Sequence, residues 1–255
     1  MSTAIVAADS GSGLFPALQA DSRKLKVFRH NVGDNGVRET DFPRVSTPLG
    51  GSTTWSFQLN GNDVTCEELT GLLVAIGKRG ELWPSDDPSG SRPVLMSHDL
   101  ITAHKVGDDL GEIDPDALEK YRTGDGTYDW LALSTGPEFG YGSGRNGSGR
   151  KAKERRILAI LREGDVWPLL VNISAGSFST LLPFLKRLPC MPYEAVVGLS
   201  LDRAKGKTGQ SYSQVIPRLI GELTEEQGEV VYETYTRPIE AMFSARPMGS
   251  ANSEE

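Results

Sequence analysis

The sequence predicts a mainly β fold with some helix, organised as a five-stranded barrel with peripheral helices and a long insertion between strands 1 and 2. Three observations predict it. The 255 residues include 29 glycines and 15 prolines, which is typical of loop-rich folds. Five apolar runs bounded by turn residues have the character of strands. One stretch with helical spacing of its apolar residues falls between the third and fourth runs.

Each expected strand follows from its apolar content and its boundaries. The first contains glycines 77 and 80, where a strand can bend. The helix between the third and fourth strands covers 177–188 and ends before Pro189. This order is that of an OB-fold barrel, in which the loops joining strands 1 and 2 and strands 4 and 5 bind oligonucleotides or oligosaccharides. The five expected strands are 69–83, 154–161, 166–174, 193–201 and 212–223.

The five strands are expected to belong to a single domain that covers 51–245. Residues 1–50 are expected to form a partly irregular N-terminal arm, in which the basic stretch Ser22–Arg29 is a short strand or arm. The insertion covers 84–150 and closes in a glycine-rich loop, 136–149. We also expect short strands at 53–59 and 128–134, and helices that begin at Asp114-Pro115 and at Thr224. Residues 246–255 are expected to be a flexible acidic tail.

Positive charge is concentrated at one place in a chain whose formal net charge is -7. A chain of this kind meets a polyanion at a focused site rather than over its whole surface. Cations beside a flexible loop are suited to nucleic-acid phosphates, and aromatic rings among glycines are suited to stacking on bases. The alternative for the cations is a solvated strand edge with scattered charges. Trp83 and Trp130 are more simply core residues than stacking surfaces. The candidate nucleic-acid-binding residues are Phe139, Tyr141, Arg145, Arg150, Lys151, Lys153, Arg155, Arg156, Lys205, Lys207 and Tyr212.

Other chemistries have weaker support in the sequence. Residues 142–147 match G-x-G-x-x-G, but a dinucleotide site needs a strand before this loop and a helix after it. His98, Asp99 and His104 are more simply polar loop residues than metal ligands, because no Cys-x-x-Cys pair accompanies them. No nucleophile elbow surrounds Ser97. We therefore expect no catalytic residues, no metal and no cofactor.

The chain resembles the single-stranded DNA-binding proteins of phages and plasmids. The resemblance rests on ERRILAIL, VWPLLVNIS and SFSTLLPFLKRL in order, on the G-x-G-R-K-A-K-x-R-R pattern, and on the terminal SANSEE. It covers roughly residues 54 to 223. It implies an OB-fold core, aromatic and basic residues that bind the strand, and an acidic C-terminus that meets replication proteins. The terminal aromatic residue that several such families carry is absent here.

These observations predict a non-enzymatic single-stranded DNA-binding protein that acts in replication or recombination, with partner proteins at the tail. The alternatives are a nucleotide- or metal-dependent enzyme that uses the glycine-rich loop, and a β-rich structural or adaptor protein. We expect no membrane contact and no secretory signal, because no apolar run reaches roughly 18 residues and the first residues lack a basic region. The two cysteines indicate a reducing cytoplasm. The oligomeric state stays open, a homo-oligomer included.

Overall fold

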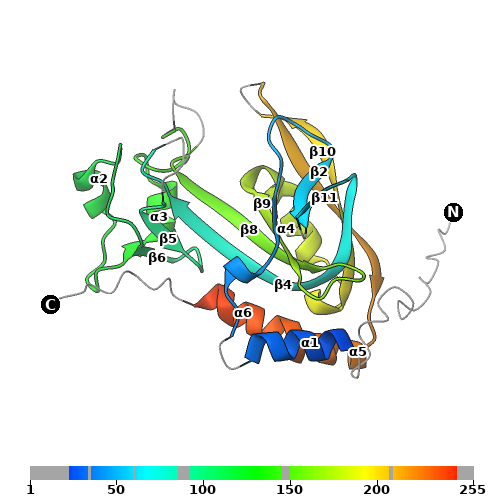
Figure 1. Cartoon of the computed structure of the whole chain (residues 1–255). Coiled ribbons are helices and arrows are strands. Elements are labelled where there is room, and N and C mark those ends of the chain that lie inside the picture. Colours follow the sequence, from blue (N-terminus) through cyan, green and yellow to red (C-terminus); the bar gives the residue numbers. More distant parts are fainter. Residues whose placement is uncertain are drawn as a thin grey trace. The chain divides into compact units, whose positions relative to one another are not determined.

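The structure is a computed structural model that describes residues 23–33, 36–59, 61–85, 92–144, 150–206 and 209–245. The chain is a mixed α/β protein in which most strands belong to one large sheet. It forms two compact units (Figure 1). Unit 1 contains described residues up to Ile76 and from Ile157 to Met242, and unit 2 contains those from Gly77 to Arg156 and from Phe243 onward. The expected tail, 246–255, lies outside the described residues.

The strands of unit 1 form a Greek key, because strand β10 returns to lie beside β4, the first strand of a meander. Neighbouring strands follow the order β11-β10-β4-β8-β9-β1. Strand β10 pairs antiparallel with both β11 and β4, and β1 pairs parallel with β9. The strands are β1 (Arg44–Ser46), β4 (Glu68–Leu82), β8 (Ala152–Leu161), β9 (Leu169–Ser174), β10 (Ala195–Lys205) and β11 (Ser211–Glu222). The last parts of β4 and the first part of β8 belong to unit 2.

The described strands do not close into a barrel. Closure would require β9 to pair with β11, but β11 pairs with β10 alone and the other edge of β9 is taken by β1. Helix α4 (Phe178–Lys186) follows the short helix η6 (Ala175–Ser177) and covers the edge of β11. Ser177 accepts a hydrogen bond from the Val215 N–H at 2.9 Å, and Thr180 donates one to the Val215 carbonyl at 2.6 Å. These two side chains bond the N–H and carbonyl of Val215, which in a closed barrel would bond to a neighbouring strand.

A separate hairpin adds to the core of unit 1. Within the described part of the chain, strands β2 (Trp55–Leu59) and β3 (Asn62–Cys66) pair only with each other. The sequence analysis identified the first of them but not the second. The Trp55 side chain is fully buried, and its indole N–H donates to the Leu199 carbonyl of β10 at 2.8 Å. The hairpin therefore packs its apolar face against β10 and α4 in one core cluster.

The basic stretch expected as a strand or arm is a helix instead, which corrects that prediction. Helix α1 (Arg23–Val32) buries Leu25 and Phe28 on one face, and these residues are three apart, at helical rather than strand spacing. Phe28 packs on Tyr235 with ring centroids 4.3 Å apart. Tyr235 belongs to the π-helix η8 (Tyr232–Thr236), which lies in the chain between the C-terminal helices α5 (Glu225–Val231) and α6 (Arg237–Ser244). The predicted cap at Thr224 is confirmed, since its side chain accepts from the Gln227 N–H.

Unit 2 contains the expected insertion and has a core of its own. Its sheet order is β4-β5-β6-β7. The predicted cap at Asp114 is confirmed, but the strand expected at 128–134 is wrong beyond its first two residues, because Asp129 caps a helix there. Trp130 begins that helix and packs on β4 where Gly80 leaves no Cβ in its way. The elements are β5 (Leu95–Ser97), β6 (Thr102–Lys105), α2 (Pro115–Glu119), β7 (Tyr128–Asp129) and α3 (Trp130–Thr135).

None of the helices in the described ranges combines the length and the apolar character needed to cross a membrane.

Candidate nucleic-acid interface

The described part of the glycine-rich loop, 136–144, folds back onto the start of β8. The Gly140 N–H donates to the Gly136 carbonyl at 2.7 Å, and the Ser143 hydroxyl donates to the Gly140 carbonyl at 2.6 Å. The Lys151 N–H then donates to the Ser143 hydroxyl at 3.1 Å. A Cβ on Gly140 would lie 2.5 Å from the Gly136 carbonyl oxygen, so only glycine fits this turn. The loop is thus attached directly to the basic strand.

Phe139 is not available to stack on a base, which corrects its predicted role. Its side chain is only 2% exposed and belongs to the core of unit 2, where its ring meets Tyr121 edge-on at 5.8 Å. The Phe139 carbonyl accepts from the Ala152 N–H at 3.0 Å, and this bond holds the residue against β8. Glycine neighbours do not prevent burial, because the whole turn packs as a unit. Tyr141, by contrast, is 66% exposed.

Glu138 attaches the same loop to the end of α2. One carboxylate oxygen accepts from the Lys120 ammonium at 2.8 Å and the other from the Tyr121 hydroxyl at 2.5 Å. These bonds lower the pKa of Glu138 to about 2, the bond from Lys120 contributing most. Burial, together with the bond to Glu138, raises the pKa of Tyr121 to about 12.

The Glu138 anchor makes the stability of the loop depend on pH in acid. A carboxyl whose pKa is lower in the folded chain stabilises the fold above its ordinary pKa of 4.5 and loses that contribution as the pH falls toward about 2. We expect Glu138→Gln to lower the melting temperature at neutral pH and to have progressively less effect as the pH falls below 4.5. Melting curves of both proteins across this range, with the exposed Glu119→Gln as control, check it. An equal difference at every pH would contradict this role of Glu138.

The basic segment 150–156 enters and begins strand β8 (Ala152–Leu161), so the strand expected at 154–161 is confirmed. A dinucleotide site would need a helix after the glycine-rich loop, and that condition is not met. Arg150 is exposed, and the other cations of the segment are half-buried. Burial lowers the pKa of Arg156, with Glu154 opposing that effect. The half-buried cations are Lys151, Lys153, Arg155 and Arg156.

Beside Arg155 lies an aromatic side chain that the sequence analysis placed in the core. Trp83 is half-buried, and its indole N–H donates to the Glu81 carboxylate at 3.2 Å. The same carboxylate contacts the Arg155 guanidinium at 3.3 Å. The pKa of the neighbouring Arg79 is lowered, mainly because the side chain is buried. The negative charge of Glu81 opposes this effect, and the positive charge of Arg155 adds to it. The Glu81 carboxylate thus lies between the guanidiniums of Arg79 and Arg155, next to a half-buried indole. The sequence signal for a partly open Trp83 is its position directly after Leu82, the last residue of β4.

The remaining candidates lie in unit 1 or outside the described residues. Lys205 is exposed at the end of β10, and Tyr212 is half-buried against Gly176, where a Cβ would lie 2.9 Å from the ring. Both residues belong to unit 1, whereas the basic segment 150–156 belongs to unit 2. The groove predicted to join them to the basic segment stays a prediction. Arg145 and Lys207 lie outside the described residues.

A polar cavity of about 440 Å³ in unit 2 contains the residues considered as metal ligands. The Asp99 carboxylate accepts from the Ser97 hydroxyl and from the Ile101 and Thr102 N–H groups. Asp125 accepts likewise from the Thr123 and Thr127 hydroxyls. Among the described residues, no three potential ligands are grouped to hold a metal ion. The cavity is lined by His98, Asp99, Thr102, His104, Asp125, Thr127 and Ser244.

No protein-family model, curated protein or solved structure matches this chain.

Proposed function

We propose that the chain binds single-stranded DNA and acts in replication or recombination without catalysing a reaction. The observation that carries the proposal is the basic segment 151–156 at the start of β8, with Trp83 beside Arg155. Cations on an extended strand follow a phosphate backbone, and a partly open indole provides a surface for a base. Neither feature distinguishes one base from another, so the binding is expected to tolerate any base sequence.

The strand order supports this proposal. The order β11-β10-β4-β8-β9, with α4 between β9 and β10 in the chain, is that of an OB-fold whose strands 3 and 5 are left unpaired. OB-folds are partly open Greek-key barrels that bind oligonucleotides on strands 2 and 3 and on the loops between strands 1 and 2 and between strands 4 and 5. In this assignment β8 is strand 2, and the glycine-rich loop precedes it. The basic segment then lies where such folds bind nucleic acid.

Titration with oligo-dT, followed by tryptophan fluorescence, tests the proposal. Trp55 and Trp130 are fully buried, while Trp83 and Trp167 are half-buried. We expect oligo-dT to quench the fluorescence at low salt and Trp83→Phe to remove most of the quench. Trp83→Ala is expected to weaken binding by about 1–3 kcal/mol, because one stacked base is lost.

Trp167→Phe is the matched control. Trp167 lies in unit 1, where its ring packs edge-on against Phe28 and Phe42 with centroids 5.0 and 5.3 Å away. Its replacement is expected to leave the quench unchanged. Absence of oligo-dT binding at low salt would refute the proposed function. Full affinity of Trp83→Ala would remove Trp83 from the site.

A further inference from the structure

Strand β11 has a short segment of open edge beside helix α4. Val215 presents its N–H and carbonyl to Ser177 and Thr180 of the helical side, as described above. The N–H and carbonyl groups of successive residues point to opposite edges of a strand. Those of every second residue, Val215, Pro217 and Leu219, therefore point to the same outer edge. Pro217 has no N–H to offer, which is typical of edge strands. Among the described residues, no side chain occupies the outer peptide groups of Leu219.

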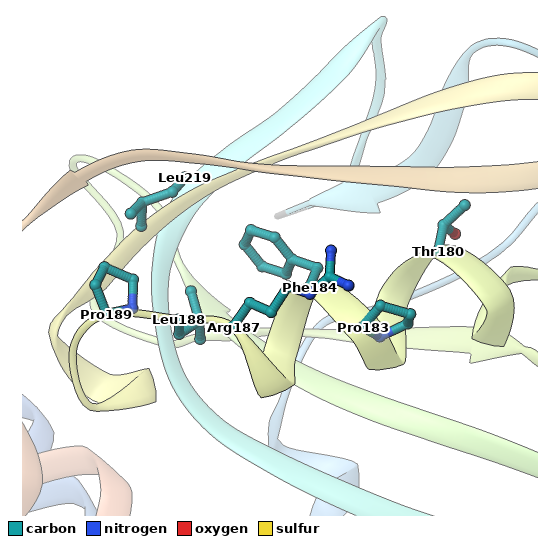
Figure 2. Close-up of a pocket in the computed structure, with 7 residues that line it drawn as sticks. All are labelled: Thr180, Pro183, Phe184, Arg187, Leu188, Pro189 and Leu219. Atoms are coloured by element: carbon teal, nitrogen blue, oxygen red, sulfur yellow. The ribbon is translucent and has the colours of Figure 1, made fainter. Parts of the chain in front are cut away.

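The open segment borders an apolar cavity of about 340 Å³ (Figure 2). Figure 2 shows Leu219 on β11 facing the ring of Phe184 on α4, with Pro189 and Leu188 beneath it. Phe184, Leu188 and Leu219 are partly buried and pack on the core, so the cavity floor is rigid and apolar. The lining residues are Thr180, Pro183, Phe184, Arg187, Leu188, Pro189 and Leu219.

Positive charge borders the cavity. Lys186 and Arg187 end helix α4, are both exposed, and make no ion pair within the described part of the chain. Arg218, on the neighbouring position of β11, is different, because Glu68 holds it through two hydrogen bonds of 2.7 Å. Among the described residues that line the cavity, Arg187 is therefore the cation without an ion pair, and it would pair with a carboxylate brought by a ligand.

We propose that this cavity, here called the α4–β11 groove, binds an extended acidic protein segment that carries one large apolar side chain. The segment would add to the edge of β11 through the peptide groups of Leu219, place its apolar side chain between Phe184 and Leu219, and pair a carboxylate with Arg187. Open backbone groups favour a peptide over a nucleobase, because strand addition gives main-chain hydrogen bonds that a base cannot reproduce. Pro217 restricts the added strand to a short one.

Fluorescence polarisation of the full chain with a labelled Glu-Glu-Phe-Glu-Glu peptide, without nucleic acid, tests the groove. We expect saturable binding that is lost when Phe is replaced by Ser or when the backbone N–H groups of the peptide are methylated. Arg187→Glu should weaken binding by about tenfold or more, as expected for a lost charged hydrogen bond. The same variant should bind a Lys-Lys-Phe-Lys-Lys peptide more tightly than the unmodified chain does. Arg23→Glu, an exposed cation of α1, is the matched control.

Three outcomes would overturn this proposal. The first is absence of saturable binding by the acidic peptide. The second is displacement of the peptide by oligo-dT together with weaker oligo-dT binding by Arg187→Glu, which would make the groove a nucleic-acid site. The third is a concentration-dependent dimer in sedimentation that Arg187→Glu abolishes, which would place a second copy in the groove. The peptide titration is carried out without nucleic acid and does not depend on whether the basic strand binds DNA, so the two proposals fail separately.

Discussion

Replacing the four half-buried cations of the basic strand by alanine is expected to reduce oligo-dT affinity at low salt by a hundredfold or more and to flatten its salt dependence. Each phosphate contact with a single strand contributes about 0.7 to the slope of log affinity against log salt, so four contacts account for about 3. Affinity measured at several salt concentrations gives both quantities. The four residues are Lys151, Lys153, Arg155 and Arg156.

The control for this variant removes the same charge elsewhere. Alanine at four exposed cations outside the strand changes the net charge equally and is expected to change the slope little. Arg155 also pairs with Glu81, so its loss can lower stability as well as affinity. The double variant of Lys151 and Lys153 avoids this and should flatten the slope by about 1.4. An unchanged slope in both variants would contradict phosphate binding by β8. The control cations are Arg23, Arg38, Lys105 and Arg122.

Trp55→Ala is expected to lower the free energy of unfolding by about 3–5 kcal/mol, the usual cost of truncating a fully buried aromatic residue. Trp55 is 0% exposed, and its ring fills the core between the β2–β3 hairpin and β10. Trp55→Phe keeps a ring but leaves the Leu199 carbonyl without the indole N–H, at a cost of about 1–3 kcal/mol. Urea denaturation followed by circular dichroism measures both changes.

The half-buried Trp83 provides the comparison for Trp55. Trp83→Phe removes a bond to Glu81 at a partly open position and should change the unfolding free energy by less than about 1 kcal/mol. A similarly small loss for Trp55→Ala would mean that the hairpin does not stabilise unit 1. The two tryptophans thus separate stability from binding, since Trp55 is expected to affect the first and Trp83 the second.

Long apolar runs could be located from the sequence because their burial depends little on their partners. Strand β8 is an example: its Ile157–Leu161 half is continuously buried, as is typical of a strand covered on both faces. Helix α4 could be located for a related reason, since Leu181 and Leu185 lie on one face at helical spacing. The cap at Thr224 depends on bonds within four residues, which a local pattern contains in full.

The missed elements depend on contacts distant in the chain. Strand β3 is polar and half-exposed, and only its pairing with β2 makes it a strand. Helix α1 contains four Lys and Arg residues among its ten, and its buried Phe28 packs on Trp167 and Tyr235, which are far along the chain. Phe139 was expected to be open because its neighbours are glycines, yet Tyr121 and Ala152 enclose it. No local window contains these partners.

The sequence by itself determined the order β4, β8, β9, α4, β10 and β11 and the position of the basic segment, because hydrophobic period and charge are properties of neighbouring residues. Only the tertiary structure decided that Phe139 is buried, that Trp83 meets Glu81 and Arg155, and that α4 takes the place at the edge of β11 that barrel closure would need. Each of these findings depends on contacts between residues that are far apart in the chain. The packing of the whole fold decides which of those contacts form, and no short stretch of chain contains that information.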